Sequence, residues 1–378
     1  MQKHNLAIFT VGRSDFGILQ NIIKRCELDK RFNLYLVIGS AHKSKIFGNT
    51  QKEINSFKLK NKIYFKFNYK DSSNKDIIKY FNKTLNETNN ILLKKKFDAS
   101  VILGDRYEML AISLACFYHK IPIMHFCGGS QTLGSLDDRY REYISKMSSV
   151  HLLETKHHKK NLFNLGIKKN LEVVGAPALE NIKEELKKSK NSKNLDLSFN
   201  LDKKIVTACF HPETTKNKIS NLKNLKILLK FLKSLNVNLV FTYPNADAGF
   251  QDYIKIIKNY LSKKNNTYLV KNLGRKKYYQ LLKISSVLVG NSSSGIIESS
   301  SFKLPTIDIG DRQKGRFRAP NTIHSKFNLK NLRKAYMKAS SKKFINKVNR
   351  LKNPYYKENT SKKSLNIINN FLVRNGSI

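Results

Sequence analysis

The chain has 378 residues, an ordinary apolar fraction of 40% and a formal net charge of +44. Chains of this length usually form more than one domain, because a single hydrophobic core stops growing at a smaller size. Two domains are therefore the default expectation. No apolar run approaches the roughly 20 residues that a membrane span requires, and the apolar stretch near the N-terminus is too short for a signal peptide. We therefore expect a soluble, cytoplasmic protein with no membrane partner.

The excess of positive charge has two interpretations. Dense lysine and arginine create a field that attracts nucleic acid or an anionic surface. The alternative is codon bias, because lysine, asparagine and isoleucine are all frequent here and can all be encoded by AT-rich codons. Lysine gathers in spacers such as residues 183–194 and 341–353, whereas residues 101–150 carry equal numbers of acidic and basic residues. No aromatic-plus-basic module of the usual RNA-binding kinds is present, so we favour codon bias and expect no nucleic-acid partner.

The first half of the chain alternates short β-rich runs with helical patterns. Residues 6–12 (LAIFTVG) predict a buried strand, and residues 16–28 then show apolar residues at helical spacing. The further predicted strands are FNLYLVIGS (32–40), KIYFKFNY (62–69), SVILGD (100–105), IPIMHFCGG (121–129), VHLLE (150–154) and LEVVG (171–175).

The same pattern restarts after residue 180. The strands predicted there are KIVTACFHP (204–212), VNLVFTYPN (237–245), TYLVKN (267–272), SSVLVGN (285–291) and LPTIDIG (304–310). Strands separated by helices indicate βαβ units and parallel sheets, so the fold class is α/β with two doubly wound, Rossmann-like domains. We place these domains at residues 1–175 and 176–361, and residues 362–378 predict a C-terminal amphipathic helix.

Unexpected polar residues follow the ends of these strands, where parallel sheets present ligands. The first-half groups are GRSD (12–15), GDR (104–106) and CGGS (127–130), and the second-half groups are HPET (211–214), PNAD (244–247) and NSSSG (291–295). The four cysteines, at positions 26, 116, 127 and 209, form no CxxC motif, and we expect free thiols in a reducing compartment.

The stretch NSSSGIIE (291–298) is free of lysine and predicts an anion site. A strand runs into small residues and then into a helix that begins near Gly295, whose free N–H groups and positive dipole end would favour a phosphate. Glu298, one turn further on, could accept from a sugar hydroxyl. The structural alternative is a serine N-cap with a polar first turn.

Seven motifs in one order resemble the hydrolysing UDP-N-acetylglucosamine 2-epimerases, which supply N-acetylmannosamine and related sugars for sialic and legionaminic acid synthesis. They are GRSDFG (12–17), GDRYEMLA (104–111), HFCGGSQTLGSLDDRYREYISKMS (125–148), HPETT (211–215), YPNADAG (243–249), NSSSGIIE (291–298) and IDIGDRQKGR (307–316). The resemblance implies a glycosyltransferase-B-like arrangement with the nucleotide sugar in a cleft that the two domains face. It also implies a C-terminal helix that packs back on the first domain, no metal or redox cofactor, and a homodimer.

The mechanism implied by the resemblance is anti elimination of UDP across C1 and C2 of the sugar, followed by hydration of the unsaturated product to the 2-epimer. Departure of the diphosphate must lead, because no carbonyl group acidifies the C2 proton. Matching the motifs residue by residue assigns the diphosphate to Arg13, His211, Ser293, Ser294 and Arg316, with Glu298 on the ribose. The acid/base groups would be Asp105 and Asp137, the latter preferred over the neighbouring Asp138, with Arg141 orienting them.

The sequence departs from the family at Ser130, where the family carries an acidic residue thought to take part in proton transfer. Glu142, four residues after Asp138 on one helical face, could return a carboxylate. Alternatively, the substrate differs from that of the family and is, for example, a modified N-acetylated sugar. A further alternative is that the chain binds nucleotide sugars and turns them over poorly. The other hypotheses are a non-hydrolysing 2-epimerase, a glycosyltransferase and a nucleic-acid-binding protein.

Overall fold

The computed structural model describes residues 3–43, 50–68, 74–180, 182, 195, 197, 199–200, 202–243, 250–262, 265–270 and 273–376. The chain divides into a first unit (Met1–Ser130, Asp137–Asn181 and Tyr355–Ile378) and a second unit (Gln131–Leu136 and Ile182–Pro354). The second unit thus has limits a few residues from the expected 176–361. It also contains the short segment 131–136, which the sequence assigned to the first domain.

The first unit is built on a parallel sheet with the strand order β3-β2-β1-β4-β5-β6-β7. Its strands are β1 (His4–Thr10), β2 (Phe32–Ile38), β3 (Asn61–Tyr64), β4 (Ala99–Leu103), β5 (Ile123–Phe126), β6 (Val150–Leu153) and β7 (Leu171–Val173). Both faces of β1 are buried: Leu6 and Ile8 join one hydrophobic cluster, while Ala7 and Phe9 join another. This explains why the strands read as continuous apolar runs rather than alternating ones.

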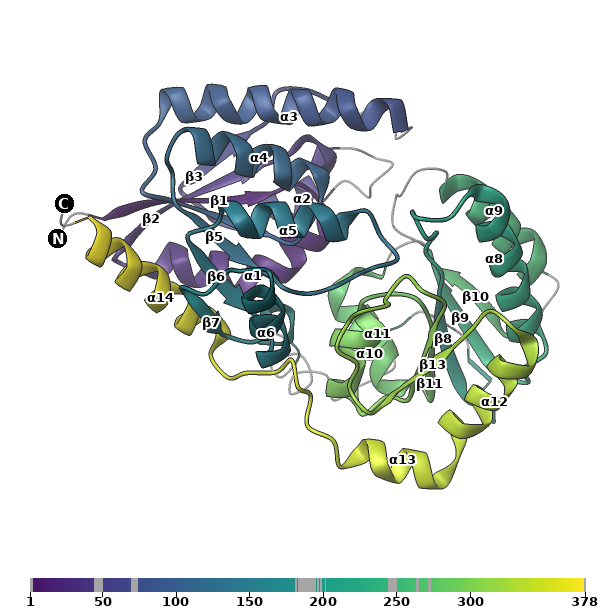
Figure 1. Cartoon of the computed structure of the whole chain (residues 1–378). Coiled ribbons are helices and arrows are strands. Elements are labelled where there is room, and N and C mark those ends of the chain that lie inside the picture. Colours follow the sequence, from purple (N-terminus) through teal and green to yellow (C-terminus); the bar gives the residue numbers. More distant parts are fainter. Residues whose placement is uncertain are drawn as a thin grey trace. The chain divides into compact units, whose positions relative to one another are not determined.

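Helices cover both faces of the first sheet (Figure 1). They are α1 (Arg13–Leu28), α2 (Gln51–Asn55), α3 (Asn74–Lys94), α4 (Tyr107–Tyr118), α5 (Asp137–Met147), α6 (Lys156–Asn164) and α14 (Thr360–Asn375), with a 3₁₀ turn η1 (Ser40–Lys43). In Figure 1, α3, α4 and α5 lie along one face, and α1, α6 and α14 lie along the other.

The second unit has a six-stranded parallel sheet with the order β10-β9-β8-β11-β12-β13. Its strands are β8 (Ile205–Cys209), β9 (Asn238–Thr242), β10 (Thr267–Val270), β11 (Val287–Gly290), β12 (Thr306–Ile309) and β13 (Thr322–Ser325). Two parallel sheets with alternating helices confirm the expected pair of doubly wound domains.

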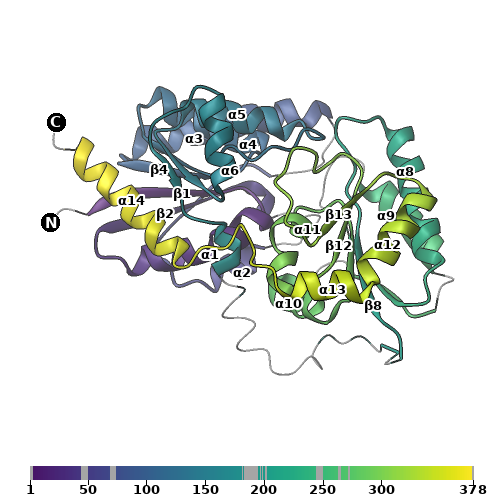
Figure 2. The ribbon, with the colours of Figure 1, turned by 60° about the horizontal axis from the view of Figure 1, so that its bottom comes forward.

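The helices of the second unit also form two layers. They are α8 (Lys218–Lys233), α9 (Phe250–Leu261), α10 (Gly274–Ile284), α11 (Ser294–Ile297), α12 (Leu329–Ser340) and α13 (Lys342–Asn349), with the 3₁₀ turn η3 (Ser299–Phe302) after α11. Figure 2 shows α8, α9 and α12 together on one side of this sheet, and α10 and α11 on the other. Among the helices of the described residues, none is long and apolar enough to cross a membrane.

Two elements of the second unit differ from the sequence-based expectation. The short edge strand β13 was not predicted, because TIHS is brief, polar and only partly buried. Part of the lysine-rich segment 341–353, interpreted from the sequence as a spacer, forms α13. Its Phe344 and Val348 are buried while its lysines remain outside, which is an amphipathic helix rather than a linker.

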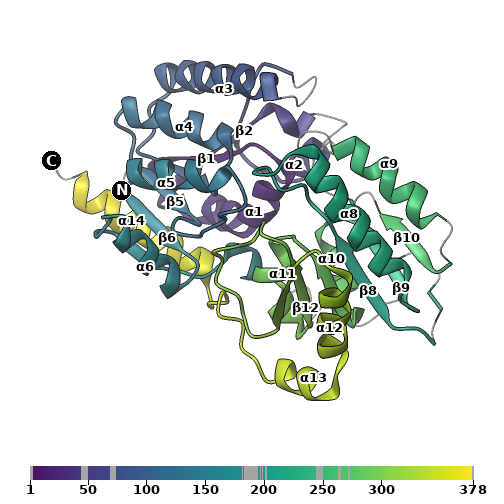
Figure 3. The ribbon, with the colours of Figure 1, turned by 45° about the vertical axis from the view of Figure 1, so that its right-hand side comes forward.

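The last helix, α14, packs against α1 of the first unit (Figures 2 and 3). Leu365, Ile368 and Leu372 of α14 join the hydrophobic cluster that contains Phe16 and Ile22 of α1. Arg25 of α1 also donates from Nε to the hydroxyl of Ser361 at 2.9 Å. Residues distant in sequence therefore complete one core.

We predict that Ile368→Ala destabilises the first unit by about 2–5 kcal/mol, because it removes a fully buried side chain and leaves a cavity. Val373→Ala on the same helix is the control, since Val373 is 54% exposed and its loss should change little. Urea denaturation followed by circular dichroism, with hydrogen exchange of α1 as a local readout, measures both. Equal effects of the two substitutions would contradict the packing described for α14.

Candidate functional site

In the first unit, the polar cluster starts at the carboxyl end of β4. The backbone turns at Gly104 with φ of +78°, a left-handed conformation that favours glycine, and Asp105 follows directly. Asp105 has 26% of its side chain exposed, so it combines partial burial with access to solvent. The carboxylate thus lies where a doubly wound sheet presents ligands.

Arg141 of α5 joins the groups of this cluster. Its guanidinium is 2% exposed, forms an ion pair with Asp105, and donates to Asp138 Oδ1 at 2.9 Å. It also donates to the backbone carbonyl oxygen of Ser130. A planar guanidinium suits this task because its donors form a fixed fork, whereas a lysine is a single point charge.

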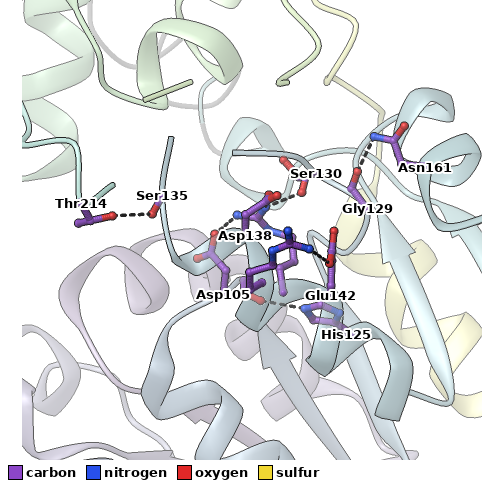
Figure 4. Close-up of polar contacts among 12 residues, drawn as sticks. Asp105, His125, Gly129, Ser130, Ser135, Asp138, Glu142, Asn161 and Thr214 are labelled. Carbon is purple, nitrogen blue, oxygen red and sulfur yellow. Dashed lines mark hydrogen bonds and ion pairs between the residues drawn. The ribbon is translucent and has the colours of Figure 1, made fainter. Parts of the chain in front are cut away.

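His125 at the end of β5 supports the same cluster. The hydrogen bond between its Nε2 and the carbonyl oxygen of Gly104 is 2.9 Å long, so Nε2 carries the proton (Figure 4). Ser145 of α5 lies 3.2 Å from Nδ1 and donates to it. Complete burial lowers the pKa of His125 to about 3, so the ring is neutral and holds the backbone beside Asp105 in place.

The two neighbouring aspartates at the start of α5 are not equivalent. Asp138 is only 9% exposed in its side chain and is engaged by Arg141, whereas Asp137 in the same first turn is half-buried. Glu142, the alternative carboxylate, pairs with Arg139 at 3.4 Å. The ion-pair partner of Glu142 is therefore Arg139 and not Arg141. Asp137 remains the more accessible of the two aspartates for proton transfer.

Ser130 is buried, with 4% exposure, and its hydroxyl has no hydrogen-bond partner among the described residues. Gly129 before it adopts φ of +70°, and a Cβ there would lie 2.3 Å from the carbonyl oxygen of His158. The backbone of this turn is thus tightly confined. Asn161 of α6 reinforces it by donating to the carbonyl oxygen of Gly129 at 2.8 Å (Figure 4).

In the second unit, His211 follows β8 and is 4% exposed. Its Nε2 lies 3.3 Å from the sulfur of Cys209. Burial, with an added contribution from the positive charge of Arg312, lowers the pKa of His211 well below its usual range. His211 is therefore a neutral hydrogen-bonding group at this strand end.

The stretch 291–298 forms a hydrogen-bonded chain around Glu298. The hydroxyl of Tyr278 donates to Ser294 Oγ at 2.9 Å, and Ser294 donates in turn to Glu298 Oε2 at 2.5 Å. Tyr279 donates to Glu298 Oε1 at 3.1 Å. Burial raises the pKa of Glu298, and the two hydroxyl donors oppose that rise. The proton of Ser294 is thus committed to Glu298, which leaves Ser293 as the hydroxyl more suited to a phosphate.

The helix α11 that begins in this stretch is only four residues long, from Ser294 to Ile297. The N–H groups of Gly295 and Ile296 already donate to backbone carbonyls within the turn. A dipole argument therefore contributes less here than the sequence suggested, because a dipole that acts over one turn is small. The side chain of Ser293, the N-cap residue, makes no capping bond, but the hydroxyl of Ser292 accepts from the N–H of Ser294 at 3.4 Å.

The segment 310–316 lies next to these groups. Arg316 is half-buried, and its Nε is buried with no hydrogen-bond partner among the described residues. A buried guanidinium nitrogen without an acceptor is costly, so this atom is well suited to an anionic ligand. Arg312 extends from the same segment and donates from Nη1 to the carbonyl oxygen of Asn291 at 3.1 Å.

The segment Gln131–Leu136 packs on these second-unit loops. Thr215 donates to the carbonyl oxygen of Gly134 at 3.2 Å, and the hydroxyl of Thr214 accepts from the N–H of Leu136 at 3.3 Å. Figure 4 shows Thr214 directed toward Ser135. A Cβ on Gly134 would lie 2.3 Å from the carbonyl oxygen of Asp311, so only glycine permits this approach.

The structure thus brings together some, but not all, of the predicted site residues. Asp105, Asp138 and Arg141 are in direct contact in the first unit, and Ser294 contacts Glu298 in the second. Arg13 is exposed at the start of α1 in the first unit. The predicted group 244–247 lies outside the described residues.

Sequence reasoning did not identify Asn291, Tyr278, Tyr279 or the supporting role of His125. The two tyrosines lie in an amphipathic helix, where aromatic residues indicate core. Asn291 is the first residue of the motif NSSSGIIE, and its hydrogen-bond partners lie far away in the sequence. Among the described residues, no group of three or more His, Cys, Asp or Glu side chains is arranged to hold a metal ion.

A family model described as UDP-N-acetylglucosamine 2-epimerase matches residues 24–369. The chain belongs to the UDP-N-acetylglucosamine 2-epimerase family. It is therefore an enzyme of that family, and the family resemblance inferred from the seven motifs is confirmed.

Two curated relatives are similar to this chain over most of its length. One, from Campylobacter jejuni, is a "GDP/UDP-N,N'-diacetylbacillosamine 2-epimerase (hydrolyzing)" and is 38% identical over 91% of this chain and 89% of its own. Another, from Escherichia coli, is a "Polysialic acid biosynthesis protein P7" and is 31% identical over 96% of this chain and 93% of its own.

Solved structures of family members share the fold. The UDP-GlcNAc 2-epimerase from Neisseria meningitidis, bound to UDP-GlcNAc, has a TM-score of 0.83 at 18% identity and covers 96% of this chain and 99% of its own. The enzyme from Methanocaldococcus jannaschii, in complex with UDP-GlcNAc and UDP, has a TM-score of 0.78 at 19% identity, with 96% of this chain and 99% of its own covered.

We predict that Arg141→Met destabilises the first unit by about 3–5 kcal/mol, because it leaves Asp138 buried beside Asp105 with no compensating positive charge. Arg139→Met on the same helix is the control, since Arg139 is 73% exposed and its ion pair contributes little. Chemical denaturation at neutral pH compares the two variants. Similar stability of the two would show that Arg141 is not needed to hold the carboxylates.

Proposed function

We propose that the chain is a hydrolysing nucleotide-sugar 2-epimerase, which converts UDP-N-acetylglucosamine or a modified N-acetylated analogue into UDP and the free 2-epimeric sugar. The observation that carries the proposal is the buried Arg141, which holds Asp105 after β4 and Asp138 in the first turn of α5. Proton transfer at a sugar carbon needs carboxylates in fixed positions. The hydrolysing relative from Campylobacter jejuni supports the same conclusion for a chain 38% identical to it.

The first step of the proposed reaction breaks the bond between C1 and the diphosphate oxygen and removes the proton from C2. The electron pair of the C2–H bond forms the double bond, and UDP leaves with the pair of the C1–O bond. The second step adds water across the double bond: its oxygen bonds to C1, and a proton returns to C2 on the opposite face. The products are UDP and, from UDP-N-acetylglucosamine, N-acetylmannosamine.

In the first unit, we assign the proton transfers to Asp105 and Asp137. Both are partly accessible, whereas Asp138 is buried against Arg141 and has the geometry of a positioning group. Arg141 pairs with the carboxylate of Asp105 and fixes its position. His125 fixes the backbone before Asp105.

In the second unit, we assign the diphosphate to His211, Ser293 and Arg316; Arg13 stays a prediction from the motif match. Donors aimed at the developing charge of the leaving diphosphate lower the barrier to its departure. The buried Nε of Arg316, which lacks a partner among the described residues, supports this assignment. Ser294 then acts through Glu298, to which it donates a hydrogen bond. The carboxylate of Glu298 has further lone pairs that Ser294 and Tyr279 do not use, and these can accept from a ribose hydroxyl.

Ser130 suggests that the sugar is a modified one. A serine in place of the family's acidic residue is smaller and uncharged, which leaves room for a substituent on the sugar. The relatives from Campylobacter jejuni and Legionella pneumophila are both named for N,N'-diacetylbacillosamine. We therefore propose a diacetylated sugar as the first analogue to test, in a pathway to a nonulosonic acid. A cytoplasmic location, where the four free cysteines stay reduced, and a homodimer belong to the same proposal.

The test is to incubate the purified protein with UDP-N-acetylglucosamine and, separately, with UDP-N,N'-diacetylbacillosamine in D₂O, and to follow both by NMR. The proposed reaction releases UDP and places deuterium at C2 of the free 2-epimer. If the sugar stays attached to UDP, the activity is that of a non-hydrolysing epimerase. Binding of UDP with neither release nor exchange would overturn the proposal in favour of a binding protein.

Asp137→Asn and Asp138→Asn separate the two roles at the start of α5. We expect Asp137→Asn to abolish turnover while it leaves the melting temperature and UDP affinity nearly unchanged, because it removes an accessible proton acceptor. Asp138→Asn should lower the melting temperature by several degrees, because it weakens a buried ion pair. Turnover, calorimetric melting and UDP titration measure the three quantities, and the reverse pattern would exchange the assignments.

A further inference from the structure

Asn291 occupies the first position after β11 and is 1% exposed. The preceding Gly290 has φ of +152°, and a Cβ there would lie 1.9 Å from the carbonyl oxygen of Cys209 at the end of β8. The two strands therefore approach very closely where they end. This approach places Asn291 beside the residues that follow β8.

The side chain of Asn291 binds the backbone of His211 at both of its polar groups. Its Oδ1 accepts from the N–H of His211 at 2.7 Å, and its Nδ2 donates to the carbonyl oxygen of His211 at 2.8 Å. The last paired residues of the two strands are Gly290 and Cys209, so the amide side chain continues the pairing beyond the strand ends. The backbone of His211 is thus fixed by one side chain.

The backbone carbonyl oxygen of Asn291 binds a third segment. It accepts from Arg312 Nη1 at 3.1 Å and from Gln313 Nε2 at 3.0 Å. Gln313 is itself 1% exposed. One buried residue consequently joins the loops 211–215, 291–295 and 310–316, and each of these loops carries one of the proposed diphosphate groups, His211, Ser293 and Arg316.

Only asparagine meets both demands of the side-chain pairing without a shift in the backbone. Aspartate has the same shape but no donor, and it would set a negative charge against the carbonyl oxygen of His211. Glutamine is one methylene longer, and serine is too short to reach both groups.

We propose that Asn291 is a positioning residue for the diphosphate: it holds the three loops in register so that their donors converge on one anion. The inference rests on the proposed function and adds a residue that touches no substrate. Asn291 acts through His211 and through the segment that carries Arg312 and Arg316. Its loss therefore weakens recognition of the diphosphate rather than that of the nucleoside.

The test compares the affinities of UDP and uridine, measured by calorimetric titration, for the wild type and Asn291→Asp. We expect UDP to bind about tenfold or more weakly to the variant, a cost of at least about 1.4 kcal/mol, while the affinity for uridine changes less than about twofold. A general loss of structure would weaken both ligands alike. Asn291→Ser, which keeps a small polar side chain, provides a second variant if Asn291→Asp does not fold.

Asn238 provides a matched control in the same unit. It is fully buried at the start of β9, accepts from the N–H of Asn200 at 3.0 Å, and donates to the carbonyl oxygens of Asn200 and Lys203. Asn238→Asp should lower the melting temperature in the same way as Asn291→Asp. The substitution should leave the ratio of UDP to uridine affinity unchanged, because Asn238 lies at the amino end of β9, away from the carboxyl ends where parallel sheets present ligands.

Three outcomes decide the inference. A selective loss of UDP affinity in the Asn291 variants, absent from Asn238→Asp, supports it. Unchanged affinities, or equal losses for UDP and uridine, overturn it while the wild type still binds UDP. If the wild type itself fails to bind UDP, the proposed function fails as well, and the two failures are thus distinguishable.

Discussion

The buried guanidinium of Arg141 is the constraint on which the polar edge of the first unit depends. Two carboxylates and a backbone carbonyl oxygen converge on it, and without its charge their mutual repulsion and desolvation would push them apart. A parallel sheet alone brings strand ends together; it does not keep like charges adjacent. Arg141 therefore holds the carboxylates of Asp105 and Asp138 side by side, as the proposed acid/base role of this cluster requires.

The second unit solves a different problem with different chemistry. The groups proposed there for the diphosphate are an imidazole, a hydroxyl and a guanidinium, all of which can donate hydrogen bonds. Asn291 joins the loops 211–215 and 310–316 through its bonds to His211, Arg312 and Gln313, and the buried Glu213 also accepts from the N–H of Asp311. The one acidic member of the stretch 291–298, Glu298, accepts from the hydroxyls of Ser294 and Tyr279.

Much of the fold could be predicted from the sequence, because buried parallel strands are continuous apolar runs in it. The edge strand β13 lacked that signal, and α13 was concealed by its lysines. The site was accessible only in part. Glycine and polar residues after strands indicated Asp105, His211 and Ser293 as candidates, and the motif match already preferred Asp137 to Asp138. The burial of Asp138 against Arg141 could be seen only in the structure. Asn291 depends on contacts between residues about 80 positions apart, which no local pattern encodes.

The position of α14 has a consequence for synthesis of the protein. Its buried face completes the cluster formed by α1 near the start of the chain, yet the ribosome makes it only after the whole second unit. Domains generally fold as units as the chain emerges, so the second unit can finish folding while the first still exposes the apolar surface of α1. During that interval the nascent chain carries an unfinished hydrophobic face, and this is the surface on which a chaperone would act.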